Sequence, residues 1–279
     1  MIRRLQVTVL ADNSAGAPGL LAEHGLSVLI EADGRRILFD TGQGTALPAN
    51  LTALNLDLAP LDAVVLSHGH YDHTGSLSYV LREADPPAVF LHPAALDNKY
   101  AKRETLPHRS IGIPGPSRIA LDAARSRIVW TRAATEIAPG IWCTGEIPRR
   151  HTAEQTAGYF FLDADCREPD PLVDDQALAV ETERGLVVIA GCAHSGVMNT
   201  LDHVTALGGR QDVLALIGGL HLGQAPHAQL EATGNAIERR NIRILAPCHC
   251  TGAAAQAYLR GRFHTRVREA GAGIRLTID

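Results

Sequence analysis

Residues 66–75 hold four side chains that can bind metal ions in the segment LSHGHYDHTG. His68 and His70 alternate in an extended stretch, so both imidazoles point to the same side and can bind one ion. Asp72 and His73 follow on a tightening turn, where they can face a second ion. Imidazole nitrogen suits zinc, iron or manganese, and the carboxylate adds a hard oxygen ligand. Two ions about 3.5–4 Å apart can activate a water molecule and neutralise charge on a leaving group.

A histidine-rich polar loop without metal is the alternative interpretation of this segment. The apolar run that leads into His68 predicts a strand, and Thr74 and Gly75 open a predicted helix. This context favours the metal site.

The elements that must position these residues alternate along the chain. Short β-branched apolar runs predict strands, and stretches of helical periodicity predict helices. Strands are expected at residues 5–11, 26–32, 36–41, 63–68, 88–92, 127–130, 140–145, 158–163, 176–182, 185–192, 213–219, 242–248 and 274–279. Helices are expected at about 44–56, 74–84, 195–207, 227–240 and 252–262, the third with Ser195 as its N-cap.

The strands are of two kinds, which decides the fold class. The runs at 63–67 and 213–217 are almost continuously apolar, as in strands buried on both faces. Residues 176–182 and 185–192 are joined by a short turn, which indicates an antiparallel hairpin. The pattern predicts an α/β (α+β) protein, a four-layer αβ/βα sandwich of two mixed β-sheets with helices outside.

One segment breaks this regular pattern. Residues 97–127 are rich in proline, glycine and basic residues and show weak periodicity, so we expect a lid or insert bordering the active site. Because the sequence has no evident linker, repeat or low-complexity tract, we expect a single domain over residues 1–279.

Composition and charge limit the partners. The net charge of −4 argues against nucleic acid and anionic membranes as partners, since both attract a concentrated excess of Lys and Arg. No apolar run is long enough to span a bilayer, and the N-terminus lacks the apolar region of a secretory signal. Five cysteines, an odd number, argue against a disulfide framework. We therefore expect a cytoplasmic protein that acts on a small molecule. The sequence leaves open whether two copies form a homodimer.

The segment at 66–75 resembles the signature of the metallo-β-lactamase superfamily. ILFDTG, at residues 37–42, is similar to its first motif. In that resemblance Asp40 supports the metal ligands through hydrogen bonds; a turn-forming aspartate at the end of a strand is the alternative. The resemblance also implies a metallo-β-lactamase-like sandwich with two divalent ions, zinc first and manganese or iron as alternatives.

Two further motifs are similar to those of the superfamily. Cys192, in GLVVIAGCAHSG, stands where the family has an aspartate that bridges both ions, and His194 follows two residues later. Either the Cys192 thiolate or His194 could supply that ligand, and we favour His194. IRILAPCHCTG resembles the last motif, which would make His249 a ligand. A buried core histidine is the alternative there, and Cys248 and Cys250 are interpreted as core residues.

The superfamily's remaining ligand histidine has no clear counterpart. It should fall near residues 140–151, where Glu146 and His151 are the candidates. Glu146 could be an oxygen ligand or a general base, although a solvated carboxylate is an equal alternative. His221 ends another apolar strand near the same edge and could contact substrate, with a core or turn role as the alternative.

Motifs along nearly the whole chain resemble one branch of the superfamily, which includes archaeal dihydropterin-ribofuranosylaminobenzene-phosphate synthases. The chemistry permits a metal-dependent hydrolase of a small phosphorylated, ester, lactone or heterocyclic substrate. A synthase-type transferase that releases pyrophosphate is the alternative. A metal-binding effector with little turnover is the third, although the complete ligand set disfavours it.

Substrate contacts are expected from two places. Basic residues of the suspected lid could hold a phosphate, with a solvated basic loop as the alternative: Lys99, Arg103, His108 and Arg109. Asp174 and Asp175 precede a strand and could orient a ligand histidine or a substrate ring, with a hairpin turn as an equal alternative. Of these we expect Lys99, Arg103 and Asp175, together with His221, to bind substrate, and Asp72 and Glu146 to be catalytic.

Overall fold

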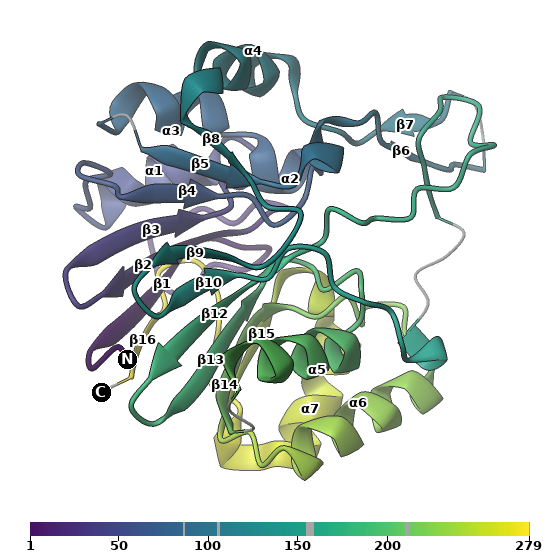
Figure 1. Ribbon diagram of the computed structural model, residues 1–279. Helices are drawn as coiled ribbons and strands as arrows, with labels where there is room; N and C mark the ends of the chain where they lie inside the picture. Colours follow the sequence, from purple (N-terminus) through teal and green to yellow (C-terminus); the bar gives the residue numbers. More distant parts are fainter. Residues whose placement is uncertain (86, 105–106, 155–158, 210–211, 279) are drawn as a thin grey trace.

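The computed structural model describes residues 1–85, 87–104, 107–154, 159–209 and 212–278. Within these ranges two large β-sheets pack face to face, and helices cover both outer sides (Figure 1). This arrangement confirms the predicted four-layer αβ/βα sandwich of two mixed sheets.

The first sheet has seven strands among the described residues, in the order β16-β1-β2-β3-β4-β5-β8. Strands β16 to β3 pair antiparallel, whereas β3, β4, β5 and β8 pair parallel. Their bounds are β1 Leu5–Ala11, β2 Ser27–Ala32, β3 Arg35–Phe39, β4 Ala63–Val65, β5 Ala88–Leu91, β8 Ile128–Trp130 and β16 Arg275–Ile278. The helices of this half are α1 Ala46–Ala53, α2 Tyr71–Thr74, α3 Leu77–Glu83 and α4 Gly115–Ala123.

The second sheet has six strands in the described part of the chain, in the order β15-β14-β13-β12-β10-β9. The pair β12 and β13 forms the predicted antiparallel hairpin, and β13, β14 and β15 run parallel. The bounds are β9 Thr135–Ala138, β10 Ile141–Cys143, β12 Ala177–Thr182, β13 Gly185–Ala190, β14 Val213–Gly219 and β15 Ile244–Cys248. Helices α5 Val197–Gly208, α6 His227–Arg239 and α7 Ala253–Phe263 cover its outer face.

Three apolar clusters hold the layers together. Between the sheets, inward residues of β2 and β3 such as Ile30 and Phe39 meet residues of β12 such as Val180. Because side chains alternate along a strand, Ala179 of the same strand faces α5 instead. A third cluster lies between the first sheet and α1, α3 and α4. Burial of this apolar surface stabilises the sandwich and fixes the sheet edges where polar loops gather.

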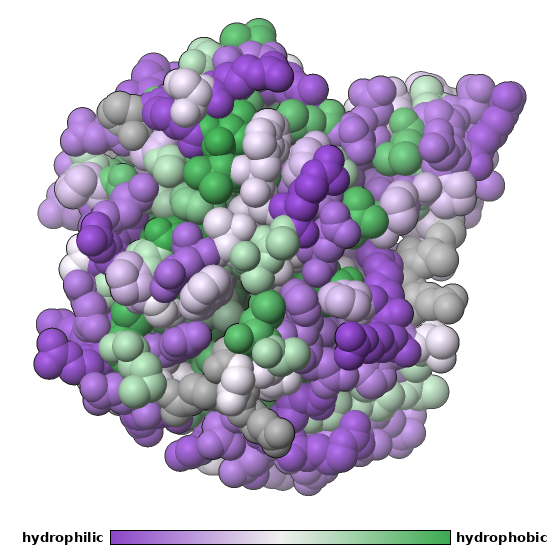
Figure 2. Space-filling view, viewed as in Figure 1, coloured by the Kyte–Doolittle hydropathy of each residue, from purple (hydrophilic) through white to green (hydrophobic). Residues whose placement is uncertain are grey.

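A small third sheet joins segments that are distant in sequence. It pairs β11 Phe160–Phe161 with β6 Tyr100–Ala101, which pairs with β7 Arg109–Ser110. These strands lie in an arm that projects from the body, and Figure 2 shows that its surface is mostly hydrophilic. The arm carries residues from both segments toward the mouth of the cavity described below.

Residues 97–127 are therefore not one irregular insert. Their first part forms β6 and β7, but their last part forms α4, and Leu121 of α4 is buried against the first sheet. The glycine and prolines at the start of this helix hide its periodicity in the sequence. Residues 105–106 of the expected insert, and residue 158 of an expected strand, lie outside the described residues.

Two helix starts also differ from expectation. The helix expected at 74–84 begins at Tyr71 as α2 and resumes as α3, so Asp72 and His73 lie on a helical turn. Helix α5 is capped by Gly196 and not by Ser195, whose amide is held by a carboxylate. The described chain also forms short 3₁₀ helices at Pro93–Leu96, Arg125–Arg127, Thr152–Glu154, His249–Thr251 and His264–Arg266. Among the described helices, none has the length and apolar character to cross a membrane.

Candidate metal centre

Strand ends from both sheets meet at one edge of the sandwich and surround a cavity of about 200 Å³. The segment after β4 brings His70 and Asp72 to it, and the segment after β13 brings Cys192 and His194. His249 follows β15 at the same edge. The cavity thus unites residues that lie more than a hundred positions apart in the sequence.

Three imidazoles form a first donor set. His68 Nε2 lies 2.9 Å from His70 Nδ1, and both side chains are buried. The ring of His194 lies 4.8 Å from that of His68 and 5.1 Å from that of His70, measured between centroids. The three imidazoles therefore converge from two segments of the chain.

A second donor set stands beside the first. His73 Nε2 lies 3.1 Å from His249 Nε2, and Asp72 Oδ2 lies 3.7 and 3.5 Å from these two nitrogens. His24 Nε2 approaches the same carboxylate oxygen at 3.2 Å from the mouth of the cavity. Two imidazoles and one carboxylate can thus bind one ion.

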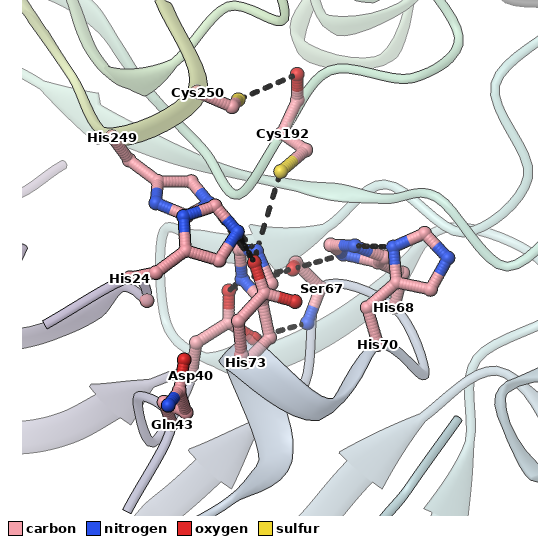
Figure 3. A network of polar contacts seen from close by, with 12 residues as sticks. His24, Asp40, Gln43, Ser67, His68, His70, His73, Cys192, His249 and Cys250 are labelled. Carbon is pink, nitrogen blue, oxygen red and sulfur yellow. Dashed lines mark hydrogen bonds and ion pairs between the residues drawn. The ribbon is translucent and has the colours of Figure 1, made fainter. Parts of the chain in front are cut away.

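Cys192 lies between the two sets. Its Sγ is 3.2 Å from His73 Nε2. Its sulfur also groups with His68 and His194 on one side and with His73 and His249 on the other, each group within 4.8 Å. Figure 3 shows the sulfur pointing toward His73, with His68 and His70 to one side and His249 to the other.

Cys192, and not the favoured His194, lies between the two donor sets. The ring of His194 lies beside those of His68 and His70 instead. Both residues belong to the centre because the chain turns after β13 and directs the two side chains to different sides of the cavity.

Burial keeps the imidazoles of the first set neutral. It lowers the pKa of His70 to about 3, and it holds the pKa values of His68 and His194 well below the ordinary range. A metal ligand must be deprotonated. The Nε2 atom of His70 is also buried without a hydrogen-bond partner among the described residues. Neutral imidazoles that face one another, one of them with an unpartnered nitrogen, fit divalent metal binding.

Asp40 and Ser67 fix the orientation of two of these rings. Asp40 Oδ2 lies 2.7 Å from His73 Nδ1 and accepts a hydrogen bond from Ser67 Oγ, which lies 2.9 Å from His68 Nδ1. Burial opposes a charge on His73, but the Asp40 and Asp72 carboxylates outweigh it and raise its pKa to about 9. Asp40 thus contacts the ring of His73 directly and the ring of His68 through Ser67.

The opposite side of the centre is fixed by residues near the N-terminus. The His249 amide donates to Asp12 Oδ1 at 2.7 Å, and its ring Nδ1 lies 2.8 Å from Asn13 Oδ1. This leaves Nε2 of His249 facing His73 and Asp72.

Asp174 and Asp175 position the segments that carry the histidines. Asp174 Oδ2 accepts from the amide of Gly69, which lies between His68 and His70, at 2.8 Å. Asp175 Oδ2 accepts from the amide of Ser195 at 2.7 Å. Burial raises the pKa of Asp175 to about 6. Both carboxylates are buried and support the histidine loops, and Asp175, which was expected to bind substrate, does not line the cavity.

Lys99, which was also expected to bind substrate, does not line the cavity. It is 1% exposed, and its Nζ lies 2.8 Å from Asp170 Oδ2 and 3.0 Å from Asp174 Oδ1. Two buried carboxylates therefore neutralise its charge away from the cavity. Arg103 is exposed and does not line the cavity, and His108 accepts a hydrogen bond from the Arg103 amide.

Replacing Lys99 with alanine is expected to lower the free energy of unfolding by about 3–5 kcal/mol, because two buried carboxylates lose their counter-ion. Arg103→Ala, at an exposed position, is the matched control and should change it by less than about 0.5 kcal/mol. Urea unfolding of the metal-free protein followed by circular dichroism measures both. Equal, small changes would show that Lys99 is not the structural ion that its contacts indicate.

Glu146 and His151 lie outside the centre. The Glu146 side chain is 49% exposed and its Oε1 lies 3.0 Å from His92 Nε2. His151 Nε2 lies 2.7 Å from Asp202 Oδ2. Neither residue lines the cavity, which corrects the expectation that Glu146 is a ligand or general base: the strand that ends before it, β10, directs it to the surface.

The structure adds cavity residues that sequence reasoning missed. His24 precedes β2 and carries no spacing signal that links it to the other histidines. Phe160 and Tyr71 are single aromatic residues on the arm and on α2. Cys250, interpreted as a core residue, faces the cavity, whereas Cys248 is fully buried in the core as expected. Of the basic lid residues considered, Arg109 lines the cavity.

His221 lines the cavity as expected, with its ring 4.4 Å from that of His194. Cys250 lies beside it. Burial raises the pKa of the Cys250 thiol, but its hydrogen bond with Cys192 and the charges of His249 and His221 outweigh burial and hold it well below the ordinary range.

Comparison with known proteins places this centre in a family. The model of the metallo-β-lactamase superfamily matches residues 21–203. The structure of Tm1679, described as a metal-dependent hydrolase of the β-lactamase superfamily, is 30% identical, with a TM-score of 0.81 over 98% of each chain. A 7,8-dihydropterin-6-methyl-4-(β-D-ribofuranosyl)-aminobenzene-5′-phosphate synthase from Methanocaldococcus jannaschii is 29% identical over 91% of this chain and 90% of the relative.

More distant structures share the fold alone. Zn²⁺-bound PqqB from Methylobacterium extorquens is 14% identical, with a TM-score of 0.58 over 97% of this chain and 99% of that one. The match over nearly the whole length of both chains agrees with the four-layer sandwich described above.

Proposed function

Because the chain belongs to the metallo-β-lactamase superfamily, we propose that it is a metal-dependent hydrolase with two divalent ions, acting on a small phosphorylated, ester, lactone or heterocyclic substrate. The superfamily consists largely of hydrolytic enzymes, and its fold implies divalent metal binding.

The observation that carries the proposal is the position of Cys192 between two donor sets. In the proposed centre, His68, His70 and His194 would hold one ion, and His73, Asp72 and His249 would hold the other. The Cys192 sulfur would be available to either. Zinc suits this mixture of imidazole, thiolate and carboxylate, with manganese or iron as alternatives. Two such ions supply an acidified water and neutralise charge that develops on the substrate.

The outer wall of the cavity supports the substrate class. The guanidinium carbon of Arg109 lies 4.4 Å from the ring centroid of Tyr71 at the cavity wall. The described residues include no carboxylate within salt-bridge distance of Arg109, so its charge is available to an anionic group. Phe160 lies 5.1 Å from the ring of His70 between centroids and offers an apolar surface to a planar group. Of the four basic residues expected to hold a phosphate, Arg109 lines the cavity, which supports this role for it.

Metal removal and return test the hydrolase. Purified protein is expected to contain at least two transition-metal ions per chain by elemental analysis, and to hydrolyse a generic phosphodiester or lactone. EDTA should abolish turnover, and Zn²⁺, Mn²⁺ or Fe²⁺ should restore it. The proposal is contradicted if the protein holds no transition metal after metal has been supplied. It is also contradicted if turnover survives metal removal.

Arg109→Ala is expected to raise KM about 10-fold for a phosphodiester and to leave that for a neutral lactone nearly unchanged. One charge-assisted hydrogen bond contributes about 1.5 kcal/mol, which corresponds to about a tenfold change in binding. Steady-state kinetics on bis(p-nitrophenyl) phosphate and a neutral lactone measure the effect, with Arg103→Ala as the matched control. Equal losses on both substrates would argue against anion binding by Arg109.

A transferase that releases pyrophosphate is the second candidate, favoured by the 29% identity with the synthase. Incubation with hydroxymethyl-dihydropterin diphosphate and an arylamine ribose phosphate tests it. Pyrophosphate release that depends on both substrates supports the transferase. Ester hydrolysis without any pyrophosphate release supports the hydrolase.

A further inference from the structure

Three neighbouring strands each place a sulfur or imidazole ligand at the same distance beyond their ends. Strands β13, β14 and β15 end at Ala190, Gly219 and Cys248. Cys192, His221 and Cys250 each follow two residues later. Because β14 runs parallel to both neighbours, the three carboxyl ends meet at one edge of the sheet.

The three side chains come together at that edge. One ligand atom of each, the Sγ of Cys192, a ring nitrogen of His221 and the Sγ of Cys250, lies within 4.8 Å of the other two. All three residues line the cavity. The cluster is therefore closed on the side of the strands and open toward the space where a ligand can enter.

His221 provides a second, independent observation. Its Nδ1 is buried and has no hydrogen-bond partner among the described residues. A buried polar atom without a partner costs about 1–3 kcal/mol, and an ion that it binds is one explanation.

The backbone holds this arrangement in place. His221 has a φ of 47°, in the left-handed region, and its amide donates to Cys250 Sγ at 3.3 Å. A Cβ on Gly219 would lie 2.7 Å from the same sulfur, so only glycine leaves room for Cys250 there. Strained backbone of this kind gathers at functional sites.

We propose that Cys192, His221 and Cys250 form a further metal site for a thiophilic divalent cation such as Zn²⁺ or Cd²⁺. Two sulfurs and one imidazole are a donor set that holds zinc with a fourth position open. Thiolate ligands select soft metals, and their two negative charges offset the charge of the ion. On binding, each ligand that still carries a proton releases it to solvent. Cys192 is shared with the proposed metal pair, but the site does not depend on hydrolysis.

Titration of the reduced, metal-free protein with Co²⁺ alone tests the site. The wild-type protein is expected to bind three ions per chain by elemental analysis and to show strong sulfur-to-cobalt charge-transfer absorption. Cys250→Ser, which keeps the size of the side chain, should bind two ions with weaker absorption. Cys166→Ser is the matched control, because Cys166 lies outside the cavity, and it should bind three. Cys250→Ser with the wild-type ion count and absorption would overturn the site.

A second variant separates this site from the metal pair. His68→Ala/His249→Ala removes one ligand from each histidine set and leaves the three proposed ligands intact. It should keep one sulfur-bound cobalt ion. If this variant loses all sulfur-to-cobalt absorption and the wild type binds two ions, the metal pair in the histidine sets is supported and the further site is contradicted. A single sulfur-bound ion in both proteins would support the further site and contradict the pair.

Discussion

His68→Ala is expected to remove at least one ion from the histidine sets and to lower turnover by about 10³-fold or more. His68 is fully buried, its Nδ1 is held by Ser67 Oγ at 2.9 Å, and its Nε2 faces His70. Metal stabilisation of developing charge contributes several kcal/mol, and each 1.36 kcal/mol corresponds to about tenfold in rate. Elemental analysis after dialysis and steady-state kinetics measure the two effects.

His203→Ala is the matched control for this prediction. His203 is a partly buried histidine outside the cavity, and its Nε2 bonds the carbonyl oxygen of Thr144 at 3.1 Å. It should keep full metal content and turnover. If His68→Ala also keeps its full metal content, His68 is not a ligand and the first donor set is wrong.

Asp40→Asn is expected to weaken metal binding at pH 9 by about 10- to 100-fold, the usual effect of losing a group that orients a ligand histidine. The Asp40 carboxylate accepts from Ser67 and lies 2.7 Å from His73 Nδ1, and an amide cannot accept at both of its atoms. The metal affinities of wild type and variant are best compared at pH 9, because about half of the wild-type His73 is deprotonated at its pKa of about 9.

The pH dependence of the same variant has a definite sign. In the metal-free wild type a metal must displace the His73 proton, so apparent affinity should rise with pH up to about 9. In Asp40→Asn the pKa of His73 falls, and the rise should end at a lower pH. Isothermal titration with Zn²⁺ between pH 6 and pH 9 measures the two profiles, and identical profiles would contradict the role of Asp40.

The free energy of unfolding of the metal-free protein should also depend on protonation of His73. The folded-state pKa of His73 is raised above the unfolded value of 6.5, so this pair stabilises the fold fully below about pH 6.5. That contribution is lost as the pH rises through about 9. At pH 6 the free energy of unfolding of Asp40→Asn should be lower than that of the wild type by about 3 kcal/mol, because a buried pair is broken. This difference should shrink as the pH rises toward 9. Asp62→Asn, at a partly exposed ion pair, is the control and should show little change.

The sequence by itself determined the features that depend on local spacing. Almost continuously apolar runs and one short hairpin turn indicated the two mixed sheets, because strands buried on both faces and antiparallel hairpins differ in their local sequence pattern. The spacing from His68 to His73 identified the metal-binding segment, because neighbours within one turn have fixed relative directions. Asp40 followed from its place at the end of a strand, in a motif that resembles one of the superfamily.

Only the tertiary structure decided which distant groups meet. Lys99 is basic and lies in a polar segment, yet its partners Asp170 and Asp174 stand 71 and 75 residues away, so its burial could not be inferred from its neighbours. Arg109, in the same segment, reaches the cavity because β7 pairs with β6.

The sequence favoured His194 over Cys192 as the bridging ligand, and local spacing could not show which of the two side chains lies between the donor sets. They are two residues apart, and their directions depend on how the chain turns after β13 and on rings carried by β4 and β15. Local spacing fixes the directions of side chains within one element, whereas the position of one element against another is set by packing of the whole core. For a site assembled from several strand ends, the sequence therefore identifies residues within one segment, and the tertiary structure shows which segments meet.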